Sequence, residues 1–447
     1  MVAGRDPVEL TVARLVAGGS GMAELDGRKV FVPFTAPGER VRARLTVSKR
    51  DYAVAELDGI IEPSPHRREP RCRYFGRCGG CQLQHLGYEE QLRVKADIVS
   101  DALRRIGRLK TRVASVVPSP GEWHYRNKTQ YAVGLDARRR PVVGYYRAGT
   151  HHIIPAETCP LHPPAFDAAR RVLANHLRGT AGEAYDERTH QGNIRHLVLR
   201  TNGARTVAVV ASRSRRLDPE LVQRFQEQAG IDAVALTLNP NRTNRVLGPE
   251  TTPVSGEPVL EYELDINRLR VSPESFFQVN TTQARTLVRL VHDRLADRRW
   301  DVVVDLYSGV GALALAVADL ADRVVGIEID TAAVADATKN ARANGRDNVE
   351  FRPGDAETLP ADALPGGSGT AVILDPPRKG AGHELLAALV AARPGRVIYV
   401  SCDPATLARD LALLVASGYQ LTSVEPLDMF PQTAHVETVA ALERDDD

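Results

Sequence analysis

Three side chains near the ends of predicted strands could together carry out covalent catalysis. Cys402 lies in the turn SCDP, directly after the apolar run RVIYV. Most cysteines on strands are buried structural residues, whereas a thiol in a polar turn at a strand end is placed to react. Asp375 opens the sequence DPPR after another apolar run, and Glu437 lies in HVETV. These positions predict one site with a thiol and two carboxylates.

A thiol beside a methyl donor would solve a specific chemical problem. Carbon 5 of a uracil is a poor nucleophile, but a thiolate that adds to carbon 6 creates an enolate whose carbon 5 can take a methyl group. A base must then remove the proton from carbon 5 before the thiolate leaves. Cys402 is the predicted nucleophile and Glu437 the candidate base. By position alone, Glu437 also fits an ordinary charged residue at the start of a last strand.

The elements that must position these side chains alternate regularly in the last third of the chain. Five short β-rich runs, from VVVDLY to RVIYV, are separated by Ala-rich stretches of helical composition. Such alternation predicts a doubly wound parallel sheet, and ligands of such sheets bind beyond the carboxyl ends of the strands. We therefore expect residues 271–447 to form an α/β Rossmann-like domain with its site at that edge.

Polar residues at three successive strand ends predict an adenosine cofactor. Gly309 and Gly311 in SGVG provide a tight turn that lets a ligand approach the backbone. Glu328 ends the second strand, where a carboxylate accepts both ribose hydroxyls, and Asp355 ends the third, where it could bind an adenine amino group. The missing third glycine favours S-adenosylmethionine over NAD. Each of these acidic residues could instead cap a helix.

Four of the five cysteines form a separate group. Cys72, Cys78 and Cys81 lie close together in sequence, and Cys159 follows farther on. Without an export signal disulfides are disfavoured, so the group predicts a metal or cluster site. The spacing is uncommon for zinc and favours an iron–sulfur cluster, but zinc also remains possible.

The rest of the chain predicts two further domains. Residues 1–62 contain about five short, glycine-punctuated strands, which fit an OB-like β-barrel. Such barrels often bind nucleic acid, although this one could only support its neighbour. Residues 63–270 read as a central α/β domain that carries the cysteine group.

The charge distribution suggests an anionic partner. Residues 1–150 contain 27 Lys and Arg against 16 Asp and Glu, whereas residues 151–447 contain 31 against 40. A basic front half favours an anionic partner, but a solvated Arg-rich surface would look the same. The segment from Trp123 to Tyr131 mixes aromatics with Arg126 and Lys128. It fits either an RNA contact or an ordinary amphipathic strand.

Features of export and membrane insertion are not found in the sequence. No apolar run approaches the ~20 residues that cross a bilayer, and the N-terminal residues do not resemble a secretory signal. We expect a cytoplasmic protein with no membrane partner. No protein partner is predicted, and a monomer is the default expectation.

Several motifs, in order, resemble those of the RNA uridine-5-methyltransferases that act on 23S rRNA and tRNA. Residues 8–62 resemble the family's TRAM domain, and RCRYFGRCGGC with AETCP resembles its 4Fe-4S site. SFFQVN, DLYSGVG, DPPRKG, SCDP and HVETV resemble its catalytic signatures. The resemblance implies a class I methyltransferase that uses S-adenosylmethionine. Barrel and cluster together favour 23S rRNA, with tRNA as the other substrate considered.

The same resemblance assigns roles to individual residues. Cys402 is implied as nucleophile, Glu437 as proton acceptor and Phe276 as an aromatic that lies against the target base. Arg195 and His196 are implied as further RNA contacts. The implied cofactor positions are Gln278, Tyr307, Glu328 and Asp375, with Asp355 beside them. The implied cluster ligands are Cys72, Cys78, Cys81 and Cys159. Many members have Asn where this chain has Ala312, which puts one cofactor hydrogen bond in doubt.

Two rival functions fit parts of the pattern. An amine or small-molecule methyltransferase would use DPPR to hold a nitrogen and leave Cys402 structural, but Arg378 replaces the aromatic residue usual in that motif. A noncatalytic RNA-binding protein would keep its cluster and bind RNA without turnover.

Overall fold

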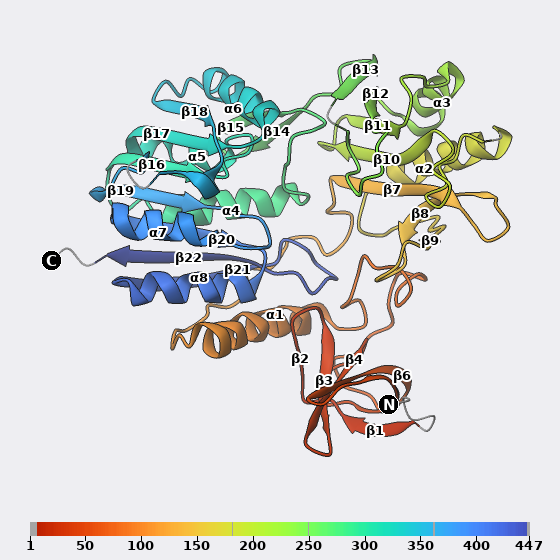
Figure 1. The fold of residues 1–447 in the computed structure, drawn as a ribbon, viewed down its shortest axis with the longest axis horizontal. Coiled ribbons are helices and arrows are strands. Elements are labelled where there is room, and N and C mark those ends of the chain that lie inside the picture. The colour runs from red at the N-terminus through yellow and green to blue at the C-terminus, as the bar shows by residue number, and fades with distance from the viewer. Residues whose placement is uncertain (1–6, 181, 249, 361–362, 445–447) are drawn as a thin grey trace.

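The computed structural model describes residues 7–180, 182–248, 250–360 and 363–444. Three large sheets follow one another along the chain and form an N-terminal, a central and a C-terminal unit (Figure 1). Within the described residues, no helix is both long and apolar enough to span a bilayer.

The N-terminal sheet curls back on itself. Its strand order is β1-β5-β6-β4-β3-β2, and only Val12 and Ala13 separate the edge strands β1 and β2. Both edges are therefore formed by one continuous stretch of chain, which closes the sheet as in a small barrel. Alternate apolar side chains, such as Val30 and Val32, fill the interior. The strands are β1 (Val8–Thr11), β2 (Arg14–Leu15), β3 (Ser20–Leu25), β4 (Arg28–Pro33), β5 (Arg40–Ser48) and β6 (Tyr52–Glu62).

The central unit is a mixed sheet in the order β13-β12-β11-β10-β7-β8-β9. Helices α2 (Pro164–Gly179) and α3 (Pro219–Ala229) pack on it through buried residues such as Phe166 and Phe225. The strands are β7 (Lys128–Leu135), β8 (Pro141–Tyr146), β9 (Ile153–Ile154), β10 (Ile194–Thr201), β11 (Thr206–Ser212), β12 (Ala233–Leu238) and β13 (Glu250–Ser255).

The C-terminal sheet confirms the predicted doubly wound arrangement. Its order is β18-β17-β16-β19-β20-β22-β21, with five parallel strands and β22 antiparallel to both of its neighbours. Its strands are β16 (Trp300–Leu306), β17 (Ala321–Glu328), β18 (Val349–Pro353), β19 (Gly367–Leu374), β20 (Pro394–Ser401), β21 (Tyr419–Leu427) and β22 (Glu437–Arg444). Its helices are α4 (Thr281–Asp293), α5 (Ala312–Ala316), α6 (Thr331–Ala343), α7 (His383–Ala392) and α8 (Pro404–Ala416).

Two segments that precede this sheet in sequence also cover it. Helix α1 (Tyr88–Ala102) contributes Val99 to the core formed with α7 and α8, and Figure 1 shows α1 beneath α8. The hairpin of β14 (Leu260–Leu264) and β15 (Asn267–Val271) packs in the core of the opposite face, with α4 and α5. The boundary predicted at residue 270 falls inside β15.

Candidate active site

Cys402 and Glu437 lie on neighbouring antiparallel strands at one edge of the C-terminal sheet. Strands β20 and β22 pair with Ser401 opposite Thr438, so Cys402 and Glu437 come next at the same end of the pair. Asp375 follows β19, the other neighbour of β20. The fold thus brings the predicted thiol and both predicted carboxylates together.

The charges of this site act strongly on the thiol. Burial first, and then the carboxylates of Glu437 and Asp375, raise the pKa of Cys402 to about 11, with Arg378 acting in the opposite direction. Burial also raises the pKa of Asp375 to about 7. Burial raises the pKa of Glu437 well above its usual value. The negative charge of Asp375 raises this pKa as well, whereas the positive charge of Arg378 lowers it. Arg378 is therefore the cation that favours the ionised forms of Cys402 and Glu437.

Glu437 is buried and has a carboxylate oxygen without a partner among the described residues. Its side chain is 2% exposed, and among the described residues its Oε1 has no hydrogen-bond partner. A buried carboxylate oxygen without a partner is costly unless a ligand completes it. The free oxygen is thus available to a group that enters the site.

A cavity beside these residues contains four of the predicted ligand contacts. Phe276, Gln278, Tyr307 and Asp375 line it. Gly311 adopts φ +88°, and a Cβ there would lie 2.5 Å from Cζ of Phe351, so a side chain would be excluded. The SGVG turn therefore keeps backbone close to this cavity, as its glycines predict.

Glu328 and Asp355 lie at strand ends but do not line that cavity. Glu328 accepts hydrogen bonds from the backbone N–H groups of Gly309, at 2.9 Å, and Asp330, at 2.8 Å. Asp355 caps the short turn Ala356–Thr358 and accepts from the N–H of Glu357 at 3.0 Å. Asp355 thus acts as a helix cap, which was the second interpretation of its position in the sequence. Ala312 begins α5 on the cavity wall.

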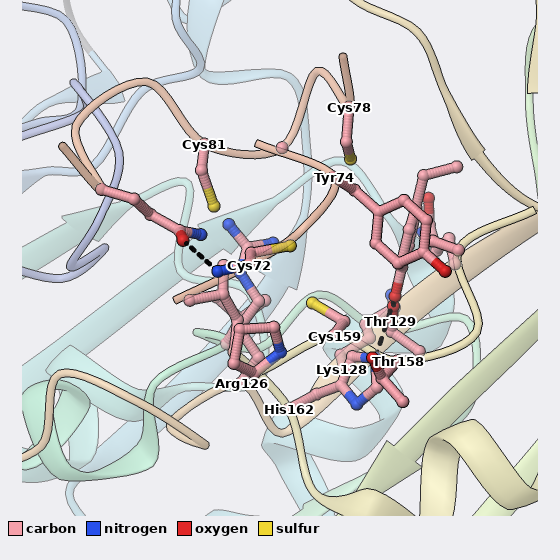
Figure 2. A pocket seen from close by; sticks show the side chains of 18 of the residues that line it. Cys72, Tyr74, Cys78, Cys81, Arg126, Lys128, Thr129, Thr158, Cys159 and His162 are labelled. Atoms are coloured by element: carbon pink, nitrogen blue, oxygen red, sulfur yellow. Dashed lines mark hydrogen bonds between the residues drawn. The ribbon is translucent and has the colours of Figure 1, made fainter. Parts of the chain in front are cut away.

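The four remaining cysteines line a second cavity of about 440 Å3. Figure 2 shows the side chains of Cys72, Cys78, Cys81 and Cys159 pointing into one space. None of them forms a disulfide, and burial raises the pKa of Cys81 and of Cys159 to about 12. Within the described ranges, no three His, Cys, Asp or Glu side chains are arranged to hold a single metal ion.

Arg126 is the cation of the cysteine cavity. Its positive charge lowers the pKa values of Cys78, Cys81 and Cys159. No carboxylate of the described residues pairs with its guanidinium, and its buried Nε has no hydrogen-bond partner. The cavity therefore combines four thiols with an unpaired cation.

A short stretch of backbone connects the two cavities. The N–H of Arg126 donates to the carbonyl of Leu161 at 2.8 Å, near Cys159. Next to it, Asn127 donates through Nδ2 to the carbonyl of Gln278 at 2.9 Å. Phe276, 65% exposed, lines both cavities. The cysteine segment is thus tied to the residues that line the other cavity.

Comparison with known proteins identifies the family. Residues 8–66 match the TRAM domain of tRNA (uracil(54)-C(5))-methyltransferase, residues 299–374 a methyltransferase domain and residues 367–445 the tRNA (uracil-5-)-methyltransferase family. An RNA methyltransferase of Gloeobacter violaceus is 41% identical and covers 98% of this chain and 96% of its own. One of Listeria monocytogenes is 37% identical, covering 97% of each chain. The chain belongs to the RNA (uracil-5-)-methyltransferase family.

A solved structure agrees with this assignment along the whole chain. The tRNA (uracil-54, C5)-methyltransferase of Pyrococcus abyssi, in complex with S-adenosyl-L-homocysteine, superposes with a TM-score of 0.77. It is 28% identical and covers 97% of this chain and 99% of its own. The chain therefore shares the fold of this relative along nearly its whole length.

Two polar residues of the methyltransferase site were missed in the sequence. Asp305, 0% exposed, and Ser308 line the cavity with Tyr307. In each of the three a buried oxygen has no partner among the described residues, and burial raises the pKa of Asp305 well above its usual value. A charged residue inside the apolar run VVVDLY was the signal that could have revealed Asp305.

Two of the predicted RNA contacts of the central domain, Tyr131 and Arg195, are buried. Tyr131 is fully buried in the core. Arg195 donates to the carbonyl oxygens of Asn239, Asn241 and Thr243 at 2.7–2.9 Å, so its guanidinium holds a loop. Lys128 differs, because it lines the cysteine cavity and burial lowers its pKa to about 7.

Proposed function

We propose that this enzyme methylates carbon 5 of one uridine in an RNA, through a covalent bond between Cys402 and carbon 6 of the base. One observation supports the proposal most strongly. Cys402 and the buried Glu437 lie together with Asp375 at the carboxyl edge of the sheet. A thiol between two carboxylates suits addition to a ring followed by proton removal.

Each chemical step has a residue that performs it. The Cys402 thiolate forms a bond to carbon 6, and the electron pair of the carbon 5–carbon 6 double bond moves into the ring. Carbon 5 then forms a bond to the methyl group, and the donor leaves with the electron pair of the bond that breaks. Glu437 accepts the proton that leaves carbon 5, the double bond forms again, and the bond to sulfur breaks to return the thiolate. Because a stacked base cannot reach Cys402, the target must lie in a loop or be flipped out.

S-adenosylmethionine is the methyl donor that fits the cavity beside Asp375. When bound, it supplies an electrophilic methyl group. The unpartnered oxygens of Asp305, Tyr307 and Ser308 offer polar contacts to a ligand. Gln278 lines the same space, while Glu328 and Asp355 at neighbouring strand ends are the proposed contacts to the adenosine. The S-adenosyl-L-homocysteine in the Pyrococcus abyssi relative supports this donor.

The cysteine cavity fits a 4Fe-4S cluster. Such clusters are held by four cysteine thiolates, and Cys72, Cys78, Cys81 and Cys159 are the proposed ligands. Ligands of a cluster bind separate iron atoms, so they need not converge on one metal position. The unpaired Arg126 offers a counter-charge to this anionic group. We assign the cluster a structural role, because Asn127, next to Arg126 of the cavity wall, donates its side-chain Nδ2 to the carbonyl of Gln278.

Two RNAs are the proposed substrates. The combination of barrel and cysteine group favours 23S rRNA, whereas the relative from Pyrococcus abyssi acts on tRNA. The enzyme is incubated with each RNA and labelled S-adenosylmethionine, and 5-methyluridine is mapped in the product. The same RNA with 5-fluorouridine at the mapped position should trap a covalent complex, since fluorine cannot leave as a cation. Methyl transfer that persists undiminished in Cys402→Ala would contradict the covalent mechanism.

A further inference from the structure

The segment 428–436, which leads into Glu437, is the place where all parts of the molecule meet. It connects β21 to β22, and its residues Asp428, Gln432 and Thr433 are 0% exposed. Buried Lys95 of α1 forms an ion pair with Asp428. A catalytic strand therefore begins directly after a segment that other units hold in position.

Gln432 is the central residue of this junction. Its backbone carbonyl accepts from the N–H groups of Gln82, at 3.2 Å, and Leu83, at 3.0 Å, just after Cys81. Its own N–H donates to Oε1 of Gln91 in α1 at 2.9 Å. Its φ of +70° is unusual for a residue other than glycine, so these contacts hold a strained conformation.

The side chain of Gln432 completes a closed polar network. Its Oε1 accepts from Nη2 of Arg68 and from Nε2 of Gln91, both at 3.0 Å. Its Nε2 donates to Oε2 of Glu122 at 2.9 Å, and Arg68 also pairs with Glu122 at 3.0 Å. Every polar atom of this amide is used, and each partner comes from outside the methyltransferase sheet.

The N-terminal barrel touches the same junction. A Cβ on Gly19, in the turn before β3, would lie 3.0 Å from Cβ of Gln82 and 3.1 Å from Cβ of Ala434. Ala434 also donates its N–H to Oε1 of Gln82 at 3.3 Å. Only two residues separate Ala434 from Glu437. The segment that precedes β22 therefore contacts the barrel, the cysteine segment and helix α1.

We propose that Gln432 is a positioning residue, which aligns Glu437 for proton removal through its hydrogen bonds to the cysteine segment, helix α1 and Glu122. The inference rests on the proposed role of Glu437 as the base. Glu437 depends on its backbone for alignment, because its Oε1 has no partner among the described residues and it is the first residue of β22. A displacement of about 1 Å at a catalytic group can cost on the order of 100-fold in rate.

Two RNA substrates separate positioning from a general loss of structure. The adduct with 5-fluorouridine RNA needs Cys402 but not the base, whereas release of ordinary methylated RNA needs both. We expect Gln432→Ala to form the fluorinated adduct within twofold of the unmodified enzyme. Its turnover of ordinary RNA should fall about 100-fold, with accumulation of methylated RNA bound to the protein. Turnover within twofold of normal, or equal losses of adduct and turnover, would overturn the proposal.

An exchange of donor and acceptor provides the rescue test. Gln432→Glu places a carboxylate, which cannot donate a hydrogen bond, next to the carboxylate of Glu122. This variant should release methylated RNA as slowly as Gln432→Ala does. Adding Glu122→Gln restores one amide and one carboxylate beside Arg68, and release should recover to within about fivefold of normal. A double variant as slow as Gln432→Glu alone would overturn the proposal. Gln420→Ala, on an exposed position of β21, is the matched control.

The proposal can fail separately from the function on which it rests. If the unmodified enzyme forms no 5-methyluridine, or if Cys402→Ala remains active, the covalent mechanism fails. If the enzyme is active and Glu437→Gln accumulates adduct while Gln432→Ala releases product normally, only the positioning role fails.

Discussion

The catalytic site and the cysteine cavity are assembled on different kinds of framework. Asp375, Cys402 and Glu437 stand at the ends of β19, β20 and β22, whose register is fixed by ladder hydrogen bonds. Cys72 and Cys81 lie on a segment without a regular element, as does Cys159 before α2. The sheet thus brings the catalytic groups to one edge, and the junction at Gln432 adds to the alignment of Glu437, whereas the cysteine cavity has no such framework of strands.

The two places also differ in charge. Around Cys402, two carboxylates oppose the thiolate and Arg378 supports it. Around Cys81, Arg126 is the charge that supports the thiolate, and no carboxylate of the described residues is paired with it. The charges around Cys402 suit a thiol that must leave the uracil ring again after methylation. The charge around Cys81 suits thiolates that stay bound to a cluster.

Replacement of the nucleophile should abolish catalysis without disturbing the fold. We expect Cys402→Ala to lower methyl transfer on the order of 10⁴-fold or more, because no other group can add to carbon 6. Cys402 is only half-buried, so the melting temperature should stay close to normal, and so should any bound iron. Label incorporation into RNA, thermal melting and iron analysis provide the measurements. Substantial residual transfer would assign Cys402 a structural role.

Replacement of the base should stop the reaction at a different point. We expect Glu437→Gln to lower turnover roughly 10²–10⁴-fold while methylated RNA accumulates on Cys402. Denaturing gels with labelled RNA would detect this complex. If free, unmethylated RNA is all that remains, Glu437 acts before methyl transfer and is not the proton acceptor.

The pH dependence should reflect the raised pKa values of the catalytic groups. With the pKa of Cys402 at about 11 and that of Asp375 at about 7, the ionised forms increase as pH rises. Since thiolate below its pKa increases tenfold per pH unit, kcat/KM should rise by roughly tenfold per unit between pH 7 and 9. The profile of kcat/KM reports the free enzyme. A flat or falling profile would mean that Arg378 dominates and the thiolate is already formed at pH 7.

The sequence predicted what depends on local order and missed what depends on long-range packing. Asp375 and Cys402 were found because the ends of parallel strands share one edge, and Cys72, Cys78 and Cys81 because their spacing is local. Arg126 was predicted as a possible RNA contact, yet it faces the cysteines. Helix α1 was assigned to the central domain by its place in the chain, although Val99 packs on the C-terminal sheet.

The junction at Gln432 illustrates the same limit. Its partners lie in segments more than 300 residues away in sequence, and no periodicity or motif spacing connects them. Asp355 shows the converse case, since the helix-cap alternative could be named in advance and the structure contains that cap, while the contact of Asp355 to a cofactor stays a prediction. Side-chain partners across domains are set by packing, which a single sequence does not specify.

Loss of one cysteine ligand should have the smallest effect on the chemistry. Cys81→Ser removes a thiol that lies apart from the catalytic groups, so we expect the variant to lose bound iron and to melt at a lower temperature. Its kcat should fall by less than about tenfold, equal to roughly 1.4 kcal/mol of barrier, because none of the hydrogen bonds that hold Gln432 involves the Cys81 thiol. Iron and sulfide analysis after anaerobic reconstitution, melting curves and single-turnover rates are the measurements. If kcat falls as far as in Glu437→Gln while melting is unchanged, the cysteine cavity takes part in catalysis, and the contrast between the two sites fails.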